Sequence, residues 1–203
     1  MKRINIDKEQ THFIGCWNLE NNELCNEIIN LFENNKNLQI QGISGKGSID
    51  PKTKKTTDIT IRPNDLKKPK FEILKNYIGE LHKCFLDYQN QWPFLKSMFN
   101  TLYVPSFNIQ KYLPGDHFAA LHSERTSLST LHRLFAWMTY LNDVEDGGQT
   151  NFSHYGIKIK PEIGKTLIWP AEWTHAHTGE VLKSGTKYML TGWMHFPAPD
   201  FKF

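Results

Sequence analysis

The chain has 203 residues, a formal net charge of +3 and 39% hydrophobic residues. These values are ordinary for a globular protein with a sizeable core. No stretch approaches the roughly 20 apolar residues that cross a bilayer, and the polar start Met1–Thr11 has no signal-peptide pattern. The three cysteines are widely spaced, which argues against a disulfide framework or a thiolate zinc site. We therefore expect a cytoplasmic protein with no membrane partner.

The mild positive charge is concentrated in the segment Lys52–Lys70, where basic residues outnumber acidic ones. A basic run of this kind can meet phosphates. It carries no interleaved aromatic residues on which bases would stack, so we expect a solvated loop and no nucleic-acid partner.

Two helices are predicted in the first half of the chain. Asn21 and Asn22 can cap the first helix, which should stop in the asparagine-rich stretch Asn34–Asn37. The second helix should start after Pro69 and end before Trp92-Pro93. Each has apolar residues at three- and four-residue spacing, namely Leu24, Ile28, Leu31 and Phe32 in the first, and Leu74, Ile78, Leu81, Phe85 and Tyr88 in the second.

Short strands dominate the predicted structure after the helices. Asp58–Arg62 alternates like a strand, and from residue 101 onward runs rich in β-branched and aromatic residues are separated by glycine-containing turns. The predicted strands of this second region are Tyr103–Tyr112, Phe118–His122, Leu134–Leu141, Thr150–Phe152, Ile157–Lys160, Thr166–Trp169, His175–Thr178 and Lys187–Phe196.

This density of strands predicts an α+β fold, a double-stranded β-helix (jelly roll) with the two helices bracing one sheet. We expect a single domain over residues 1–203, with helical support in about 1–100 and the jelly-roll core in about 101–197.

A candidate metal site begins at His122-Ser123-Glu124. Side chains two apart on a strand project from one face, so His122 and Glu124 can converge. A third ligand can come from Thr174-His175-Ala176-His177, where either histidine fits. Two imidazoles and one carboxylate form the facial triad of non-haem Fe(II) oxygenases, in which 2-oxoglutarate takes two open positions and O₂ the third. A His-x-Glu alone is more often a surface polar pair.

The last predicted strand adds candidates for binding a co-substrate. Lys187, Met189, Thr191 and Trp193 share one face of it. Lys187 could hold the distal carboxylate of a keto-diacid, and Thr191 could add a hydroxyl donor beside it. In isolation, Lys187 reads as a solvated lysine at a strand start.

Several ordered motifs resemble the 2-oxoglutarate/Fe(II) dioxygenases of the prolyl 4-hydroxylase type, in particular small phage and marine-bacterial members. The resemblance covers about residues 101 to 197. It rests on Lys111–Phe118, His122-Ser123-Glu124, Trp137–Asp143, Asp146–Phe152, Gly164–Pro170, His177-Thr178-Gly179 and Gly185–Tyr188.

The resemblance assigns roles to single residues. In the family, the metal-binding histidine precedes the basic residue for 2-oxoglutarate by ten positions, a spacing that selects His177 over His175. His175 is then expected beside the metal ligands or at the rim. Tyr112 matches a tyrosine whose hydroxyl contacts the co-substrate, and Tyr140 is a weaker candidate for the same contact.

The resemblance also implies an activity. The cofactors would be Fe(II), 2-oxoglutarate and O₂, with ascorbate as a further candidate. The reaction would be hydroxylation of a C–H bond, with release of succinate and CO₂. Peptidyl proline is the suggested substrate, while another protein side chain or a small molecule such as a free amino acid stays open.

One departure from the family pattern keeps a rival open. Most members carry His-x-Asp, whereas Glu124 is longer by a methylene and needs a hydrogen bond to hold it in place. A non-catalytic jelly-roll metal- or ligand-binding protein is the alternative. Two flanking residues carry smaller expectations: Arg133 should pair with an unnamed carboxylate, and Trp173 is the tryptophan best placed to line a substrate mouth.

Overall fold

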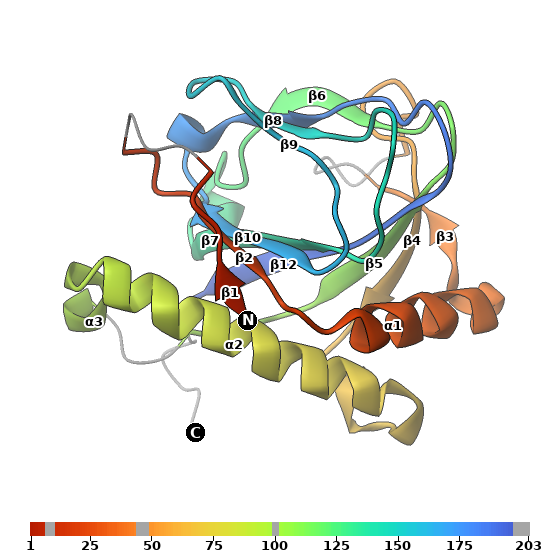
Figure 1. The fold of residues 1–203 in the computed structure, drawn as a ribbon, viewed down its shortest axis with the longest axis horizontal. Coiled ribbons are helices and arrows are strands. Elements are labelled where there is room, and N and C mark those ends of the chain that lie inside the picture. Colours follow the sequence, from red (N-terminus) through yellow and green to blue (C-terminus); the bar gives the residue numbers. More distant parts are fainter. Residues whose placement is uncertain (7–10, 44–48, 99–101, 197–203) are drawn as a thin grey trace.

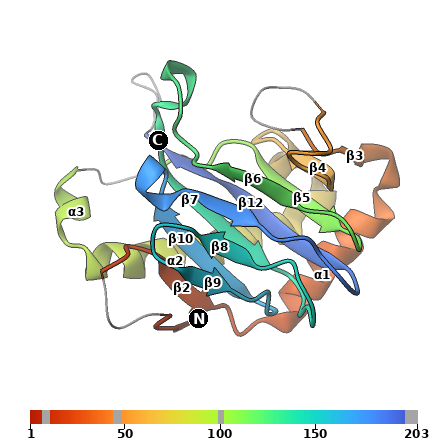
Figure 2. The same ribbon diagram turned by 90° about the horizontal axis from the view of Figure 1, so that it is seen from above.

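Two antiparallel sheets face one another, and the helices lie beneath the larger sheet (Figures 1 and 2). The computed structural model describes residues 1–6, 11–43, 49–98 and 102–196. The larger sheet has the strand order β1-β2-β10-β7-β12-β5-β4-β3, and the smaller sheet has the order β6-β11-β8-β9. The strands are β1 Lys2–Arg3, β2 Gly15–Asn18, β3 Ile40–Gln41, β4 Thr57–Ile61, β5 Phe107–Tyr112, β6 Phe118–His122, β7 Arg133–Tyr140, β8 Thr150–Phe152, β9 Ile157–Ile159, β10 Lys165–Pro170, β11 His177–Gly179 and β12 Lys187–His195. This arrangement confirms the predicted jelly roll.

Both predicted helices are present and pack on one sheet. Helix α1 spans Asn22–Asn34, and the Asn21 side chain accepts a hydrogen bond from the Leu24 N–H at 3.0 Å, as an N-cap should. Helix α2 spans Glu72–Gln91, after a 3₁₀ turn at Pro69–Phe71. The short helix α3, Phe94–Met98, follows Pro93 and was not predicted from the sequence.

The first half of the chain also adds strands to the larger sheet. Strand β2 pairs with β10, and β4 pairs with β5. The predicted strand at Asp58–Arg62 is thereby confirmed within one residue, whereas β2 was not foreseen. Because Gly15–Asn18 contains only four residues and one glycine, its pattern is too short to stand out in the sequence.

The larger sheet separates two apolar clusters. On β7, Phe135 and Trp137 pack with the helices, whereas Ala136 and Met138 pack between the sheets. Burying a large apolar side chain contributes about 1.5–3 kcal/mol, so the cluster between the helices and the larger sheet is a main source of stability. The other cluster shares its space between the sheets with a cavity.

Two strand predictions were wrong at their ends. Strand β5 begins at Phe107, and Tyr103 makes only an isolated bridge to His195. The segment Trp173–His175 is a 3₁₀ turn, so β11 begins at His177. His175 and His177 are therefore not two positions of one strand.

Candidate metal centre and co-substrate pocket

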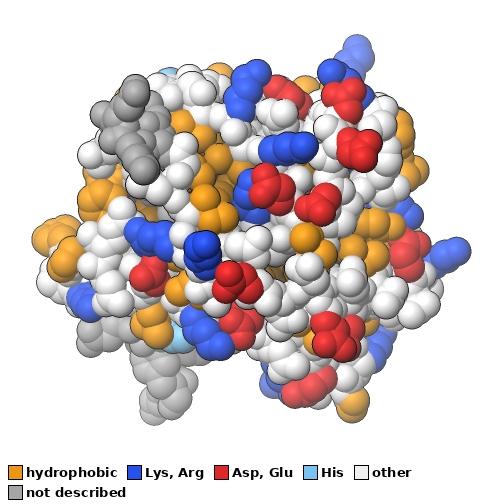
Figure 3. Space-filling model, viewed as in Figure 1, with side chains coloured by type: hydrophobic (Ala, Val, Ile, Leu, Met, Phe, Trp, Pro, Cys, Tyr) orange, Lys and Arg blue, Asp and Glu red, His pale blue; other side chains and the backbone are white. Residues whose placement is uncertain are grey.

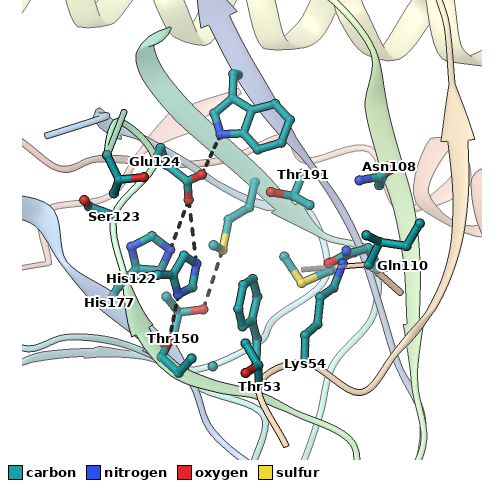
Figure 4. Close-up of a pocket in the computed structure, with 18 of the residues that line it drawn as sticks. Thr53, Lys54, Asn108, Gln110, His122, Ser123, Glu124, Thr150, His177 and Thr191 are labelled. Atoms are coloured by element: carbon teal, nitrogen blue, oxygen red, sulfur yellow. Dashed lines mark hydrogen bonds and ion pairs between the residues drawn. The ribbon is translucent and has the colours of Figure 1, made fainter. Parts of the chain in front are cut away.

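A cavity of about 510 Å³ lies between the two sheets. The loop 123–130 contributes small polar side chains to its lining, and β5 and β12 contribute the wall from the larger sheet. Figure 4 shows His122, Glu124 and His177 gathered on one side of this space, with Asn108, Gln110 and Lys54 across from them.

His122, Glu124 and His177 each bring one ligand atom to a common point, with all three atoms within 4.8 Å of one another. Oε1 of Glu124 lies 3.8 Å from Nε2 of His122 and 3.5 Å from Nε2 of His177. The pairing of His122 with His177 across β6 and β11 fixes this approach. Strand β6 ends at His122 as predicted, and Glu124 follows it, so strand alternation does not account for the approach of Glu124 to His122.

Backbone carbonyl groups orient both imidazoles. Nδ1 of His122 lies 2.8 Å from the Ala120 oxygen, and Nδ1 of His177 lies 3.0 Å from the His175 oxygen. A carbonyl can only accept, so each Nδ1 carries a proton, and each Nε2 is the ring nitrogen that faces the common point. Phe118 stacks on the His122 ring at 3.9 Å and further restricts it.

Burial keeps His177 neutral. Desolvation, with a smaller contribution from nearby His122, lowers the pKa of His177 to about 4 despite the opposing effect of Glu124. A neutral imidazole is the form that binds metals. Two imidazoles and one carboxylate, with their donor atoms converging, match the donor set of an Fe(II) facial triad.

Trp193 and Arg133 hold Glu124. The indole Nε1 of Trp193 donates to Oε2 of Glu124 at 2.6 Å, and Nη1 of Arg133 donates to the Glu124 backbone oxygen at 2.9 Å. The Arg133 guanidinium also lies 3.8 Å above the Trp193 ring. Nη1 of Arg133 lies 3.9 Å from Oε2 of Glu124, so Glu124 is the carboxylate that the sequence left unnamed for Arg133. Trp193 was not predicted as a site residue, although the alternation along the last strand places it on the same face as Lys187.

Lys187 is a buried cation at the cavity wall. Its side chain is 2% exposed, and Nζ donates to the Gly148 oxygen at 2.9 Å. Within the described part of the chain, no carboxylate lies within ion-pair distance of it, and Nζ faces the Tyr112 ring at 3.9 Å. Burial lowers the pKa of Lys187 to about 7. The expectation of a solvated lysine at this position was wrong, because Lys187 is buried. A buried ammonium group favours an anionic ligand.

The other co-substrate candidates differ in position. Tyr112 and Thr191 line the cavity, whereas Tyr140 is fully buried behind its wall. The Tyr112 hydroxyl donates to Gln110 at 2.9 Å, and the Thr191 hydroxyl donates to the Trp137 oxygen at 3.2 Å. The Tyr140 hydroxyl shares a 2.6 Å hydrogen bond with Thr150.

His175 and Trp173 lie outside the cavity lining. Nε2 of His175 lies 2.9 Å from the His12 oxygen, and its Nδ1 lies 2.9 Å from the Thr174 hydroxyl, so both ring nitrogens are used. His175 serves the site through its backbone oxygen, which contacts His177. Trp173 is 68% exposed and packs against His154.

The basic segment 52–70 is only partly a solvated loop. Lys54 is buried, lines the cavity and pairs with Asp58 at 2.6 Å, and Gln110 donates to the same carboxylate at 3.0 Å. Lys55 pairs with Asp116 at 3.0 Å. On the face drawn in Figure 3, basic and acidic side chains are interspersed. The expectation of a solvated loop was therefore wrong for Lys54, which no sequence pattern distinguishes from its neighbours.

Comparisons with known proteins agree with this geometry. Residues 107–195 match the family described as the 2OG-Fe(II) oxygenase superfamily. Human prolyl 4-hydroxylase subunit alpha-1 is 24% identical over 107 residues, which is 49% of this chain and 19% of the human protein. The chain thus spans about a fifth of the length of the curated relatives it matches. No helix among the described residues is long and apolar enough to span a membrane.

Solved prolyl hydroxylases share the fold. A Pseudomonas putida prolyl-4-hydroxylase superposes with a TM-score of 0.69 at 17% identity, covering 93% of this chain and 95% of its own. The viral collagen prolyl hydroxylase of Paramecium Bursaria Chlorella virus-1, solved with 2OG, gives 0.64 at 18% identity and covers 91% of this chain and 97% of its own. Residues 107–195 are therefore similar to the 2OG-Fe(II) oxygenase superfamily, and the chain shares the fold of the solved prolyl hydroxylases.

Proposed function

We propose that this protein is a 2-oxoglutarate- and Fe(II)-dependent dioxygenase that hydroxylates a C–H bond and releases succinate and CO₂. One observation carries the proposal. The donor atoms of His122, Glu124 and His177 converge in a cavity that also contains the buried amino group of Lys187, which pairs with no carboxylate in the described part of the chain. A metal with open positions and a cation for a distal carboxylate are what this chemistry requires.

The residues present fit both cofactors. His122, Glu124 and His177 would hold the iron, which together with 2-oxoglutarate and O₂ supplies the oxidising power. Lys187 would bind the distal carboxylate of 2-oxoglutarate. The negative charge of that carboxylate would stabilise the ammonium form of Lys187, which burial disfavours. Tyr112 would contact the same carboxylate after its hydroxyl turns from Gln110, and Thr191 would border the co-substrate.

We propose peptidyl proline as the first substrate class to test. A Trichoplax adhaerens prolyl hydroxylase, solved with a hypoxia inducible factor peptide, shares the fold with a TM-score of 0.69 at 14% identity. The Ser/Thr-rich loop 123–130 and Asn108 offer hydrogen-bonding groups along the cavity that suit a peptide main chain. A free amino acid or another side chain is the alternative substrate.

Two further properties belong to the proposal. Ascorbate would serve as the reductant that restores Fe(II), and its addition should then prolong turnover. A cytoplasmic location fits the three cysteines, which are free and buried, because a reducing compartment keeps thiols unpaired. We also propose that the helices and the jelly roll act as one domain, since α1 and α2 share a core with the larger sheet.

The test is iron-dependent turnover of 2-oxoglutarate. Purified protein with Fe(II) and 2-oxoglutarate should form succinate, and a proline-containing peptide should raise the rate and gain the mass of one oxygen atom. His177→Ala should abolish both products, because it removes a ligand. The matched control is His154→Ala, which removes an exposed imidazole outside the cavity and should keep full activity.

The outcomes separate the rival functions. Succinate without a modified peptide would keep the oxygenase and remove peptidyl proline as the substrate. Tight binding of Fe(II) and 2-oxoglutarate without any succinate, with every candidate substrate, would favour the non-catalytic binding protein.

A further inference from the structure

A glutamate ligand can bind a metal through both carboxylate oxygens more readily than an aspartate can. Its longer side chain has one more torsion, so its carboxylate can rotate and present both oxygens to a bound cation. With two imidazoles, a two-oxygen carboxylate would fill four of six positions. Only two would then be left, whereas 2-oxoglutarate and O₂ together need three.

The structure gives the two Glu124 oxygens different partners. Oε1 faces Nε2 of both His122 and His177, at 3.8 and 3.5 Å. Oε2 accepts the 2.6 Å hydrogen bond from Nε1 of Trp193 and lies 3.9 Å from Nη1 of Arg133. One oxygen therefore points to the metal position, and the other is taken.

Arg133 fixes both ends of this contact. Its guanidinium lies 3.8 Å from the centre of the Trp193 ring, which is a cation–π distance. The same guanidinium donates to the Glu124 backbone oxygen at 2.9 Å. Both the indole and the backbone of the glutamate are thus held by one side chain at the start of β7.

Packing alone does not explain the Trp193 hydrogen bond. Among the described residues, the indole N–H groups of Trp137 and Trp169 are buried without a hydrogen-bond partner. This fold therefore tolerates buried indoles that donate to nothing, although such a group carries a desolvation cost. Trp193 is only half-buried, and it nevertheless directs its N–H at a carboxylate oxygen of the metal centre.

We propose that Trp193 is a positioning residue that keeps Glu124 a one-oxygen ligand, with Arg133 as its support. The inference rests on the proposed function, since it concerns the iron site of that oxygenase. It explains how a His-x-Glu sequence leaves the third open position that O₂ requires. Without the indole N–H, Oε2 of Glu124 is free to turn to the metal and close that position.

The test measures whether the third coordination position is open, without relying on turnover. Nitric oxide binds to Fe(II) where O₂ would bind, and its complex is followed by electron paramagnetic resonance under anaerobic conditions. In Trp193→Phe loaded with Fe(II) and 2-oxoglutarate, we expect the affinity for nitric oxide to fall at least about tenfold. Affinity for 2-oxoglutarate should change less than about threefold, because two positions are still open.

The matched control is Trp173→Phe, which makes the same chemical change at an exposed indole outside the cavity and should behave as the parent. A Trp193→Phe protein that binds iron more weakly, but once loaded takes up nitric oxide like the parent, overturns the proposal. If the unmodified protein itself fails to bind Fe(II) and 2-oxoglutarate, the proposed function fails instead.

A second measurement uses the metal-free protein and does not depend on how the Trp193 variant folds. Each of the six tryptophans contributes one indole N–H signal to a ¹⁵N-edited nuclear magnetic resonance spectrum. Glu124→Asp withdraws the carboxylate, so the Trp193 resonance should move while that of exposed Trp173 stays. An unmoved Trp193 resonance contradicts the contact on which the proposal depends.

Discussion

The two faces of strand β12 have opposite characters although their residues alternate along one backbone. Leu190 and Met194 pack into the apolar cluster between the helices and the larger sheet. Lys187, Met189, Thr191 and Trp193 line the cavity on the other face. The first face consists of side chains that gain stability by leaving water. The second includes the buried amino group of Lys187, which has no anionic partner among the residues that the structure describes.

The contrast shows where this fold separates stability from function. A buried unpaired cation is unfavourable in the empty protein, and the apolar face of the same sheet offsets its cost. Variants on the helix side should therefore change the free energy of unfolding and leave ligand affinity intact. Variants on the cavity side should do the reverse.

Lys187→Met should have the largest effect. It keeps the unbranched shape of the side chain and removes the terminal charge, so the affinity for 2-oxoglutarate should fall about a hundredfold or more, which is at least roughly 2.7 kcal/mol. The melting temperature of the empty protein should stay the same or rise, because a desolvated charge is removed. Calorimetric titration and thermal unfolding measure the two quantities.

Lys158→Met is the control for this variant, since it removes an exposed lysine that pairs with Glu180 at 3.4 Å. It should leave the affinity for 2-oxoglutarate unchanged. Equal losses in the two variants would mean that Lys187 acts only through the general charge of the protein.

Leu190→Ala should destabilise the protein by about 2–5 kcal/mol, because it leaves a cavity in a fully buried position. Its affinity for 2-oxoglutarate should stay within about twofold of the parent at a temperature where both proteins are folded. Denaturant unfolding gives the first value and titration the second. A large loss of affinity in the folded variant would break the proposed separation of the two faces.

The affinity for 2-oxoglutarate should fall as the pH rises above about 7. Burial lowers the pKa of Lys187 to about 7, so in the empty protein the ammonium form is lost above that pH. Binding a carboxylate requires the charged form, so affinity should decrease up to about tenfold per pH unit and binding should take up a proton. Lys187→Met should lose this dependence.

The same shift predicts how the stability of the empty protein depends on pH. Between the folded pKa of about 7 and the ordinary value of 10.5, the unfolded chain binds more protons than the native state. The contribution of Lys187 to stability should therefore rise with pH across this window.

Calorimetry in buffers of different ionisation enthalpy, at pH 6.5 and 8.5, detects the proton uptake that is predicted when 2-oxoglutarate binds. A proton release would contradict the assignment.

Two buried tyrosines provide the mildest comparison. The Tyr77 hydroxyl shares a 2.7 Å hydrogen bond with Thr139 on the helix side, and the Tyr112 hydroxyl faces Gln110 at the cavity. Tyr77→Phe should lower stability by about 1 kcal/mol and leave the KM for 2-oxoglutarate unchanged. Tyr112→Phe should raise that KM by about fivefold to tenfold. The opposite pattern would assign Tyr112 a packing role only.

Much of this architecture could be predicted from the sequence. The α1 and α2 periodicities are long, and the alternation along Lys187–His195 places its side chains on the correct faces. What could not be predicted depends on tertiary contacts. The bond between Trp193 and Glu124 joins residues 69 positions apart, and the burial of Lys54 depends on its pairing with Asp58 against Gln110. A 3₁₀ turn at Trp173–His175 precedes His177, where a strand from His175 was predicted. The residue pattern of this segment is compatible with a strand, so the pattern alone could not exclude one.

The central claim is that one cavity holds the metal on His122, Glu124 and His177 and the co-substrate on Lys187. A crystal structure with Mn(II) and 2-oxoglutarate tests it most directly, because Mn(II) accepts the same ligands as Fe(II) without consuming the co-substrate. We predict the ion within bonding distance of Nε2 of both histidines and one oxygen of Glu124, with the distal carboxylate of 2-oxoglutarate on Nζ of Lys187. An ion bound elsewhere, or a co-substrate whose distal carboxylate points away from Lys187, would contradict the account.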